Sequence, residues 1–259
     1  MFQQWPDFPI ELKLEVLQHA LHEESPIAHS RHVENLHTGQ LSSLIGTRNK
    51  ELTQLAIDTY YKSNTFTITP NILSTGIRTG GRVSEARVSM FRPRVQQARL
   101  IQRLVVELTT CLKQQLTHRW FNYRELEPGR MFLHQSSLWN FMFRLDERRR
   151  GERYFQYMRE DGGVKKRTEW QRTFTSLKSL VLHVRLGQRY TSWDFLKDIC
   201  QCHMLNDTIQ ILAYGTADIK AKDVAVVVDI EGCQSGICQV EIAEVLQGIL
   251  TGNETELGA

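Results

Sequence analysis

The sequence predicts an α+β fold, in which a short helical module (residues 1–70) ends in a strand and a mixed strand-and-helix domain occupies residues 71–259. Three observations predict this arrangement. Apolar residues recur at helical spacing near the N-terminus, the period changes to two close to Ile68, and strand and helix patterns alternate after residue 95. A length of 259 residues also fits a small module joined to a larger one.

The first helix is predicted over residues 8–21. One apolar stripe recurs at intervals of +4, +3 and +4, at Ile10, Leu14, Leu17 and Leu21. Leu12 and Val16 lie on roughly the opposite side, at about 100° per residue. Pro9 suits the first turn, and Asp7 is the expected N-cap. A short helix that is apolar on both sides is expected to pack on its own domain and on a second surface; the alternative is a helix buried in a larger core.

The rest of the module is predicted from composition and period. Residues 22–40 hold four histidines among serine, proline and glycine, which predicts a polar surface loop rather than a metal site. Leu41–Tyr61 reads as a second helix that breaks near Gly46–Asn49. Tyr60–Ile68 then alternates as a strand, which is halted by Pro70.

The second domain is predicted from alternating patterns. Strands are expected at Leu100–Thr109, Phe174–Leu186, Thr208–Tyr214 and Val224–Ile230. Helices are expected at Ser136–Leu145, after a capping box at Thr191–Asp194, and at Gln239–Leu250. The spacing of Leu177, Leu180 and Leu182 is similar to that of a leucine-rich repeat, although the strands are irregularly spaced. A degenerate leucine-rich-repeat-like α/β sheet is therefore expected.

No motif in the chain predicts catalysis. The glycine-rich segment Ile72–Arg82 lacks the lysine and the hydroxyl of a phosphate-binding loop, and a loop is expected there. Ser235 lies one place too late for a nucleophile elbow between Gly232 and Gly236. Cys200 and Cys202 would point apart on a helix, so they are expected to be packing thiols. We therefore expect no enzyme activity, no metal and no cofactor.

Charge is concentrated in the middle of the chain. Residues 82–172 carry 20 basic and 10 acidic side chains, and the densest part resembles an insertion near residues 147–172. We expect the following residues to contact an acidic or phosphorylated protein target: Arg148, Arg149, Arg150, Arg153, Lys165, Lys166 and Arg167. The alternatives are a solvated loop balanced by nearby carboxylates, and nucleic-acid binding, which no recognised fold motif supports.

Several residues of the helical module (residues 1–70) match the sequence pattern of a known protein family: Pro9, Glu11, Leu12, Leu44, Thr47, Ala56, Tyr60, Tyr61, Asn64, Thr65 and Phe66. This unit resembles filamentous-fungal proteins identified as F-box or F-box-like. The resemblance covers about the first 70 residues, and ordinary F-boxes are shorter than this chain over residues 22–40.

The resemblance implies a non-catalytic substrate-recognition subunit of a cullin-RING ubiquitin ligase. The residues that would face its Skp-type adaptor are Phe8, Pro9, Leu12, Val16, Leu41 and Leu44. A stand-alone interaction module without ligase docking is the alternative, and residues 22–40 and Arg48 favour it. A basic nucleic-acid-binding protein is a further alternative.

Composition predicts an intracellular protein. No apolar run approaches the roughly 18–20 residues needed to cross a bilayer, so no membrane partner is expected. The N-terminus lacks the basic and apolar regions of a secretory signal. Five cysteines without framework spacing are expected to be reduced thiols, which fits the cytoplasm or the nucleus.

Overall fold

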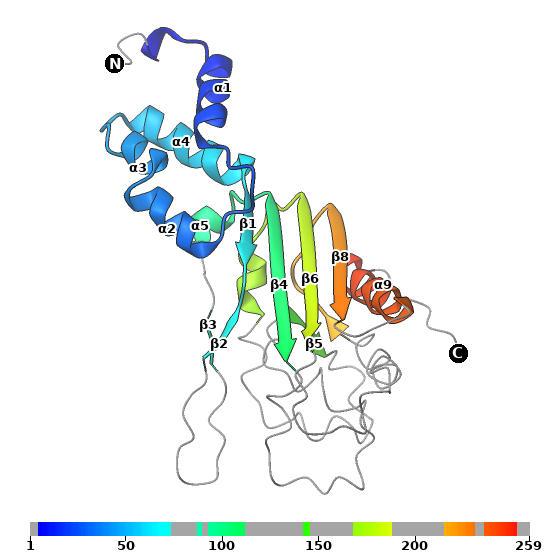
Figure 1. Cartoon of the computed structure of the whole chain (residues 1–259). Helices are drawn as coiled ribbons and strands as arrows, with labels where there is room; N and C mark the ends of the chain where they lie inside the picture. The colour runs from blue at the N-terminus through cyan, green and yellow to red at the C-terminus, as the bar shows by residue number, and fades with distance from the viewer. Residues whose placement is uncertain are drawn as a thin grey trace, which may run out of the picture.

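The computed structural model describes residues 5–73, 87–89, 93–111, 142–145, 168–187, 215–230 and 236–252. Its first part is a group of helices: η1 (Trp5–Asp7), α1 (Ile10–Leu21), α2 (His29–His37), α3 (Gln40–Ile45) and α4 (Lys50–Ser63). Figure 1 shows them gathered at one end of a sheet, with η1 and α1 extending away from it. No helix in the described segments has both the length and the apolar character needed to cross a membrane.

Four parallel strands form the main sheet. They are β1 (Thr65–Ile68), β4 (Arg103–Cys111), β6 (Ser179–Gly187) and β8 (Asp223–Ile230), and they lie side by side in chain order. β1 is an edge strand of this sheet, and Ile27 pairs with its outer side. The predicted domain boundary at residue 70 directly follows β1, so strands from both sides of that boundary share one sheet.

The alternation of each strand gives the sheet two different faces. On one face, Phe66, Leu104 and Leu180 lie in register and are buried. The opposite face carries residues such as Thr67, Val105 and Val181, which are half-buried, and Ala225, which is exposed. Helix α9 (Ile237–Thr251) packs on β8, and its buried hydrophobic residues include Ile242, Val245, Leu246 and Leu250. The core therefore lies on one side of the sheet and continues into the helices.

Smaller elements complete the described structure. β2 (Asn71–Leu73) pairs antiparallel with β3 (Arg87–Ser89), and β5 (Arg144–Leu145) pairs antiparallel with β7 (Gly215–Thr216). The short helices α5 (Val95–Ala98) and η6 (Glu169–Thr173) precede β4 and β6. Gln171 of η6 joins two of these segments, because its side chain donates to Met142 O at 2.7 Å and accepts from Asp218 N at 2.7 Å.

Several sequence predictions are confirmed. The predicted break near Gly46–Asn49 separates α3 from α4, and Asn49 caps α4 by accepting from Leu52 N at 3.1 Å. β8 matches the strand predicted from Val224, and α9 begins two residues before the helix predicted from Gln239. The strands predicted from Leu100 and Phe174 are present as β4 and β6, but each begins later.

Other predictions are wrong. Residues 22–40 contain α2, not only a loop, because the buried positions of that helix are His32 and Asn35 and carry no apolar period. Residues 60–63 are helical rather than extended, because α4 continues until it has buried Tyr60 and Tyr61. Asp7 belongs to η1, and Pro9 occupies the N-cap position of α1.

Two further corrections concern short strands. The helix predicted over Ser136–Leu145 is wrong at its end, where Arg144 and Leu145 form β5. The loop predicted over Ile72–Arg82 begins inside β2, whose three residues pair with β3. These strands pair with residues distant in the sequence, so no local pattern indicates them. The segments predicted at Thr191–Asp194 and Thr208–Tyr214 lie outside the described residues.

Candidate functional site

Helix α1 is attached to the protein along one line of residues. Lys13, Leu17 and Leu21 are spaced by four and are the buried residues of the helix. They face α4, and α3 makes a smaller contact. The remaining positions of α1 are exposed, so most of the circumference of the helix faces away from the protein.

The exposed part of α1 is unusually apolar. Five large apolar side chains are exposed here, with fractions of 39% for Phe8, 46% for Ile10, 48% for Leu12, 41% for Leu14 and 41% for Val16. Single exposed apolar residues are common on protein surfaces, but contiguous groups mark interaction sites. We call these five residues the α1 apolar surface.

The α1 apolar surface has two sides. Leu12 and Val16 form one stripe, and Ile10 and Leu14 form a second stripe nearly opposite, at about 100° per residue. Glu11 lies on the polar strip between them. Ile10 and Leu14 belong to the stripe expected to face the chain's own core, but only its second half, Leu17 and Leu21, is buried. Figure 1 shows the reason: the N-terminal half of α1 extends beyond the other helices.

An ion pair and an aromatic ring hold the projecting half of α1. Lys13 Nζ lies 2.8 Å from Glu51 Oε1 on α4. The same ammonium group lies 5.9 Å from the centroid of the Trp5 ring, within the range of a cation–π contact. Trp5 is itself buried and contacts Phe8 with ring centroids 6.4 Å apart. The anchor therefore fixes the base of the α1 apolar surface without covering it.

The predicted adaptor-facing residues divide into two groups. Phe8, Pro9, Leu12 and Val16 are exposed on or just before α1. Leu41 on α3 is 1% exposed and belongs to the core, and Leu44 is half-buried against that core. Leu41 cannot contact a partner in this conformation, because α3 uses it to pack against its neighbours.

The predicted partner-binding residues of the basic insertion lie outside the described residues: Arg148, Arg149, Arg150, Arg153, Lys165, Lys166 and Arg167. The same holds for Cys200, Cys202 and His203. Within the described segments, no group of three or more His, Cys, Asp or Glu side chains is arranged to hold a metal ion.

A buried histidine fixes α2 against α4. His32 Nδ1 lies 3.2 Å from Tyr60 Oη, and His32 Nε2 lies 3.4 Å from Tyr61 Oη. A neutral ring donates through one nitrogen and accepts through the other, so it can satisfy both hydroxyls. Burial, with a smaller contribution from His29, lowers the pKa of His32 from 6.5 to about 4. Burial also raises the pKa of Tyr60 to about 12.

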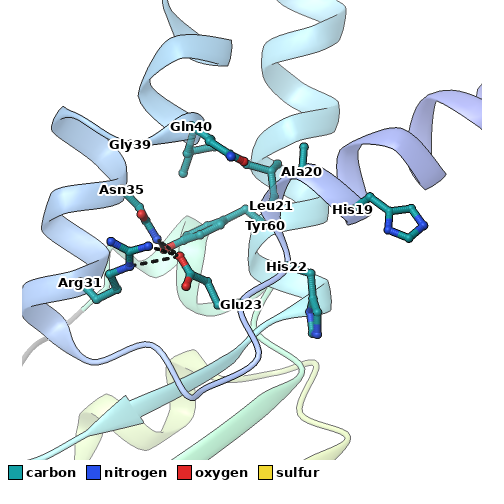
Figure 2. Close-up of a pocket in the computed structure, with 11 residues that line it drawn as sticks. His19, Ala20, Leu21, His22, Glu23, Arg31, Asn35, Gly39, Gln40 and Tyr60 are labelled. Carbon is teal, nitrogen blue, oxygen red and sulfur yellow. Dashed lines mark hydrogen bonds and ion pairs between the residues drawn. The ribbon is translucent and has the colours of Figure 1, made fainter.

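A polar pocket of about 320 Å³ lies where the end of α1 meets α2, α3 and α4. Figure 2 shows Arg31, Asn35 and Tyr60 converging near Glu23, whereas His19 and His22 point away. Glu23 Oε1 accepts from Arg31 Nη2 at 3.0 Å and from Asn35 Nδ2 at 3.1 Å. These charges compensate one another, so the pocket stabilises the junction of the helices and presents no unpaired charge near Glu23.

Comparisons with models of protein families, with curated proteins and with solved structures find no match to this chain. Function is therefore argued from geometry. Sequence reasoning identified Leu12 and Val16, but it missed Ile10 and Leu14 as surface residues. Their spacing gives no signal of exposure, because it is also the spacing of a buried stripe.

Proposed function

We propose that the protein is a non-catalytic, F-box-like substrate receptor of a cullin-RING ubiquitin ligase, and that α1 docks on the Skp-type adaptor. The observation that carries the proposal is the α1 apolar surface, and above all its stripe of Leu12 and Val16. A receptor of this kind works by proximity: α1 holds the ligase, and the rest of the chain holds the target.

The exposure of Leu12 and Val16 supports docking on energetic grounds. Burying a large aliphatic side chain contributes about 1.5–3 kcal/mol of favourable free energy. A side chain that stays exposed to water does not make this contribution. The Lys13–Glu51 pair favours a fixed orientation of α1, which lowers the entropy lost on binding. The adaptor surface that we propose comprises Phe8, Pro9, Leu12 and Val16, without Leu41.

We further propose that the sheet is a degenerate leucine-rich-repeat-like unit that recognises the target. Two features support this proposal. The four parallel strands follow chain order, as they do in a solenoid, and one face of the sheet carries exposed or half-buried side chains. The target itself is expected to be acidic or phosphorylated, as the composition of residues 82–172 predicts.

Co-purification with the adaptor tests the docking proposal. The full chain is co-expressed with a Skp-type adaptor and carries Leu12→Asp or Val16→Asp. We expect either change to remove the adaptor from the purified complex, because a carboxylate would be buried without a partner. Val240→Asp on α9 is the matched control, since Val240 is an apolar helix residue that is 57% exposed and lies far from α1 in the chain.

Retention of the adaptor by Leu12→Asp and Val16→Asp would reject the docking proposal. A second expectation concerns solubility. Expressed alone, the protein should self-associate through the α1 apolar surface, and Leu12→Asp should make it more soluble while Val240→Asp should not.

A stand-alone interaction module is the second candidate. The observation that favours it is α2, which lies between α1 and α3 and makes this region longer than an ordinary F-box. In that case α1 would bind a different apolar partner. Purification from the native cell distinguishes the two functions: cullin and adaptor subunits identify a receptor, and their absence alongside another stable partner identifies a stand-alone module.

A further inference from the structure

Basic side chains line the edge of the sheet at which its strands begin. Arg103 opens β4, Lys178 precedes β6 and Lys222 precedes β8. Lys178 and Lys222 occupy neighbouring positions, since Lys178 N donates to Gln102 O at 2.8 Å and Asp223 N donates to Lys178 O at 2.8 Å. Arg103 lies one position further along, in register with Ser179. We call Arg103, Lys178 and Lys222 the basic edge. Figure 1 shows this edge on the side of the sheet nearest the helices.

The charged side chains of the basic edge are exposed. In the part of the chain that the structure describes, none of the three side chains forms an ion pair. Arg103 Nη1 donates to the backbone oxygen of Ser63 at 3.0 Å, which directs it across the start of β1. Asp223 is the acidic side chain next to them in the chain. The nearby positions Arg99 and Lys220 are also exposed and basic.

Several other cations of the described structure are neutralised. Lys13, Lys62 and Arg172 pair with Glu51, Asp58 and Asp218, at 2.8, 2.9 and 3.2 Å. Neighbouring strands lie about 4.8 Å apart, so like charges on adjacent strand ends repel one another. An unpaired row of cations is thus unfavourable in the free protein, and an anionic partner would relieve the repulsion.

We propose that the basic edge binds an extended, carboxylate-rich segment of a partner protein. The basic edge runs from β4 to β8 across two strand spacings, about 10 Å, which an extended chain covers in about three residues. Two of the three cations are lysines, which act as point charges and do not impose the bidentate geometry of arginine. The segment is therefore expected to be selected by its charge density. The basic edge lies away from α1, and this proposal does not require the adaptor.

Nucleic acid fits the basic edge less well. Proteins that bind single strands combine cations with exposed aromatic rings on which bases stack. The aromatic residues of the described segment just before Lys178 are Trp170 and Phe174, and both are buried. Neither of these two described rings therefore offers a stacking surface beside Lys178.

A labelled peptide tests the proposal on the full chain. The probe is a fluorescein-labelled peptide with five consecutive glutamates, and binding is followed by fluorescence anisotropy at low salt. We expect the double variant Lys178→Glu with Lys222→Glu to raise Kd about tenfold or more. Asp223→Asn should lower Kd, because it removes a repelling carboxylate. Lys50→Glu is the matched control, since Lys50 is exposed and lies at the end of α4 remote from β1.

Three results would overturn the proposal. The first is a Kd that Lys50→Glu raises as much as the double variant does. The second is binding that survives the double variant and is lost in Arg149→Glu with Arg150→Glu, which would place the site in the basic insertion. The third is tighter binding of an oligothymidine probe to the same residues. Leu12→Asp should leave peptide binding unchanged. A failure of the peptide-binding proposal can therefore be distinguished from a failure of the adaptor-docking proposal.

Discussion

Lys13 on α1 and Glu51 on α4 form an ion pair of 2.8 Å whose two partners differ in environment: the Lys13 side chain is 7% exposed, whereas Glu51 is 54% exposed. A lysine takes the position that a leucine would occupy on an ordinary buried stripe. Its alkyl stem can pack against the protein while its ammonium group reaches the surface at Glu51. The orientation of the α1 apolar surface depends on this contact.

The first prediction concerns this anchor. Lys13→Ala should lower the free energy of unfolding by about 1–2 kcal/mol, mainly through lost packing of the stem. Lys62→Ala is the control, because Lys62 forms a 2.9 Å pair with Asp58 at an exposed site and should cost less than about 0.5 kcal/mol. Urea denaturation followed by circular dichroism measures both. Equal effects would show that the burial of Lys13 contributes nothing.

The second prediction concerns Asn64, which is fully buried between α4 and β1. Its amide donates to Leu21 O at 2.8 Å and to Tyr60 O at 3.0 Å, and its oxygen accepts from Glu23 N at 2.8 Å. Asn64→Ala leaves these buried groups without partners and should cost about 3 kcal/mol.

Asn49→Ala is the comparison for Asn64→Ala. It removes a single capping bond at the start of α4 and should cost about 1 kcal/mol. Thermal unfolding of both variants gives the difference. A smaller loss for Asn64→Ala than for Asn49→Ala would contradict the role assigned to Asn64.

The third prediction is a pH dependence caused by His32. Its pKa is about 4 in the folded protein and near 6.5 when unfolded, so the unfolded chain binds the proton more tightly. The stabilisation is complete above pH 6.5 and is lost as the pH falls from 6.5 towards 4, by about 3 kcal/mol in total. His32→Phe should flatten this part of the stability profile.

His37→Gln is the control for the pH profile, because it removes an exposed histidine from the same helix. Urea midpoints between pH 7 and pH 4 measure the slope. An identical slope in wild type and His32→Phe would show that other groups cause the acid sensitivity.

The fourth prediction concerns the close approach at Gly39. A Cβ atom there would lie 2.8 Å from Asn35 Cα, a backbone atom that cannot move aside cheaply. Gly39→Ala should therefore destabilise the protein by about 1–3 kcal/mol. At Gly46 the nearest atom would be 3.4 Å away, so Gly46→Ala should change stability by less than about 0.5 kcal/mol. Denaturant midpoints of the two variants test this difference.

Local patterns predicted the four strands of the main sheet and the helices α1 and α9, because each buries a regular set of apolar residues. Leu180, Leu182 and Val184 alternate along β6, and their period is visible without any knowledge of the partners. The pairing of β6 with β4 was not predictable, since a long segment separates the two strands. Helix α2 was missed because its inward side chains are polar, and His32 satisfies them only through Tyr60 and Tyr61.

The candidate site could be predicted only in part from the spacing of apolar residues along the sequence. Period alone placed Leu12 and Val16 on an outer face, which the structure leaves exposed. The helical spacing of apolar residues could not show that Ile10 and Leu14 are exposed too, because their exposure depends on how far α1 extends past α4. The burial of Lys13 depends on Glu51, 38 residues away, and no local rule connects them.

The order of the strands also bears on how the chain is made. Each strand of the main sheet is laid against the one that precedes it in the sheet, from β1 through β4 and β6 to β8. During synthesis a nascent chain can thus add every new strand to an edge that already exists, without waiting for residues still in the ribosome. Helix α9 follows β8 in the chain and can pack on it once that strand has joined the sheet.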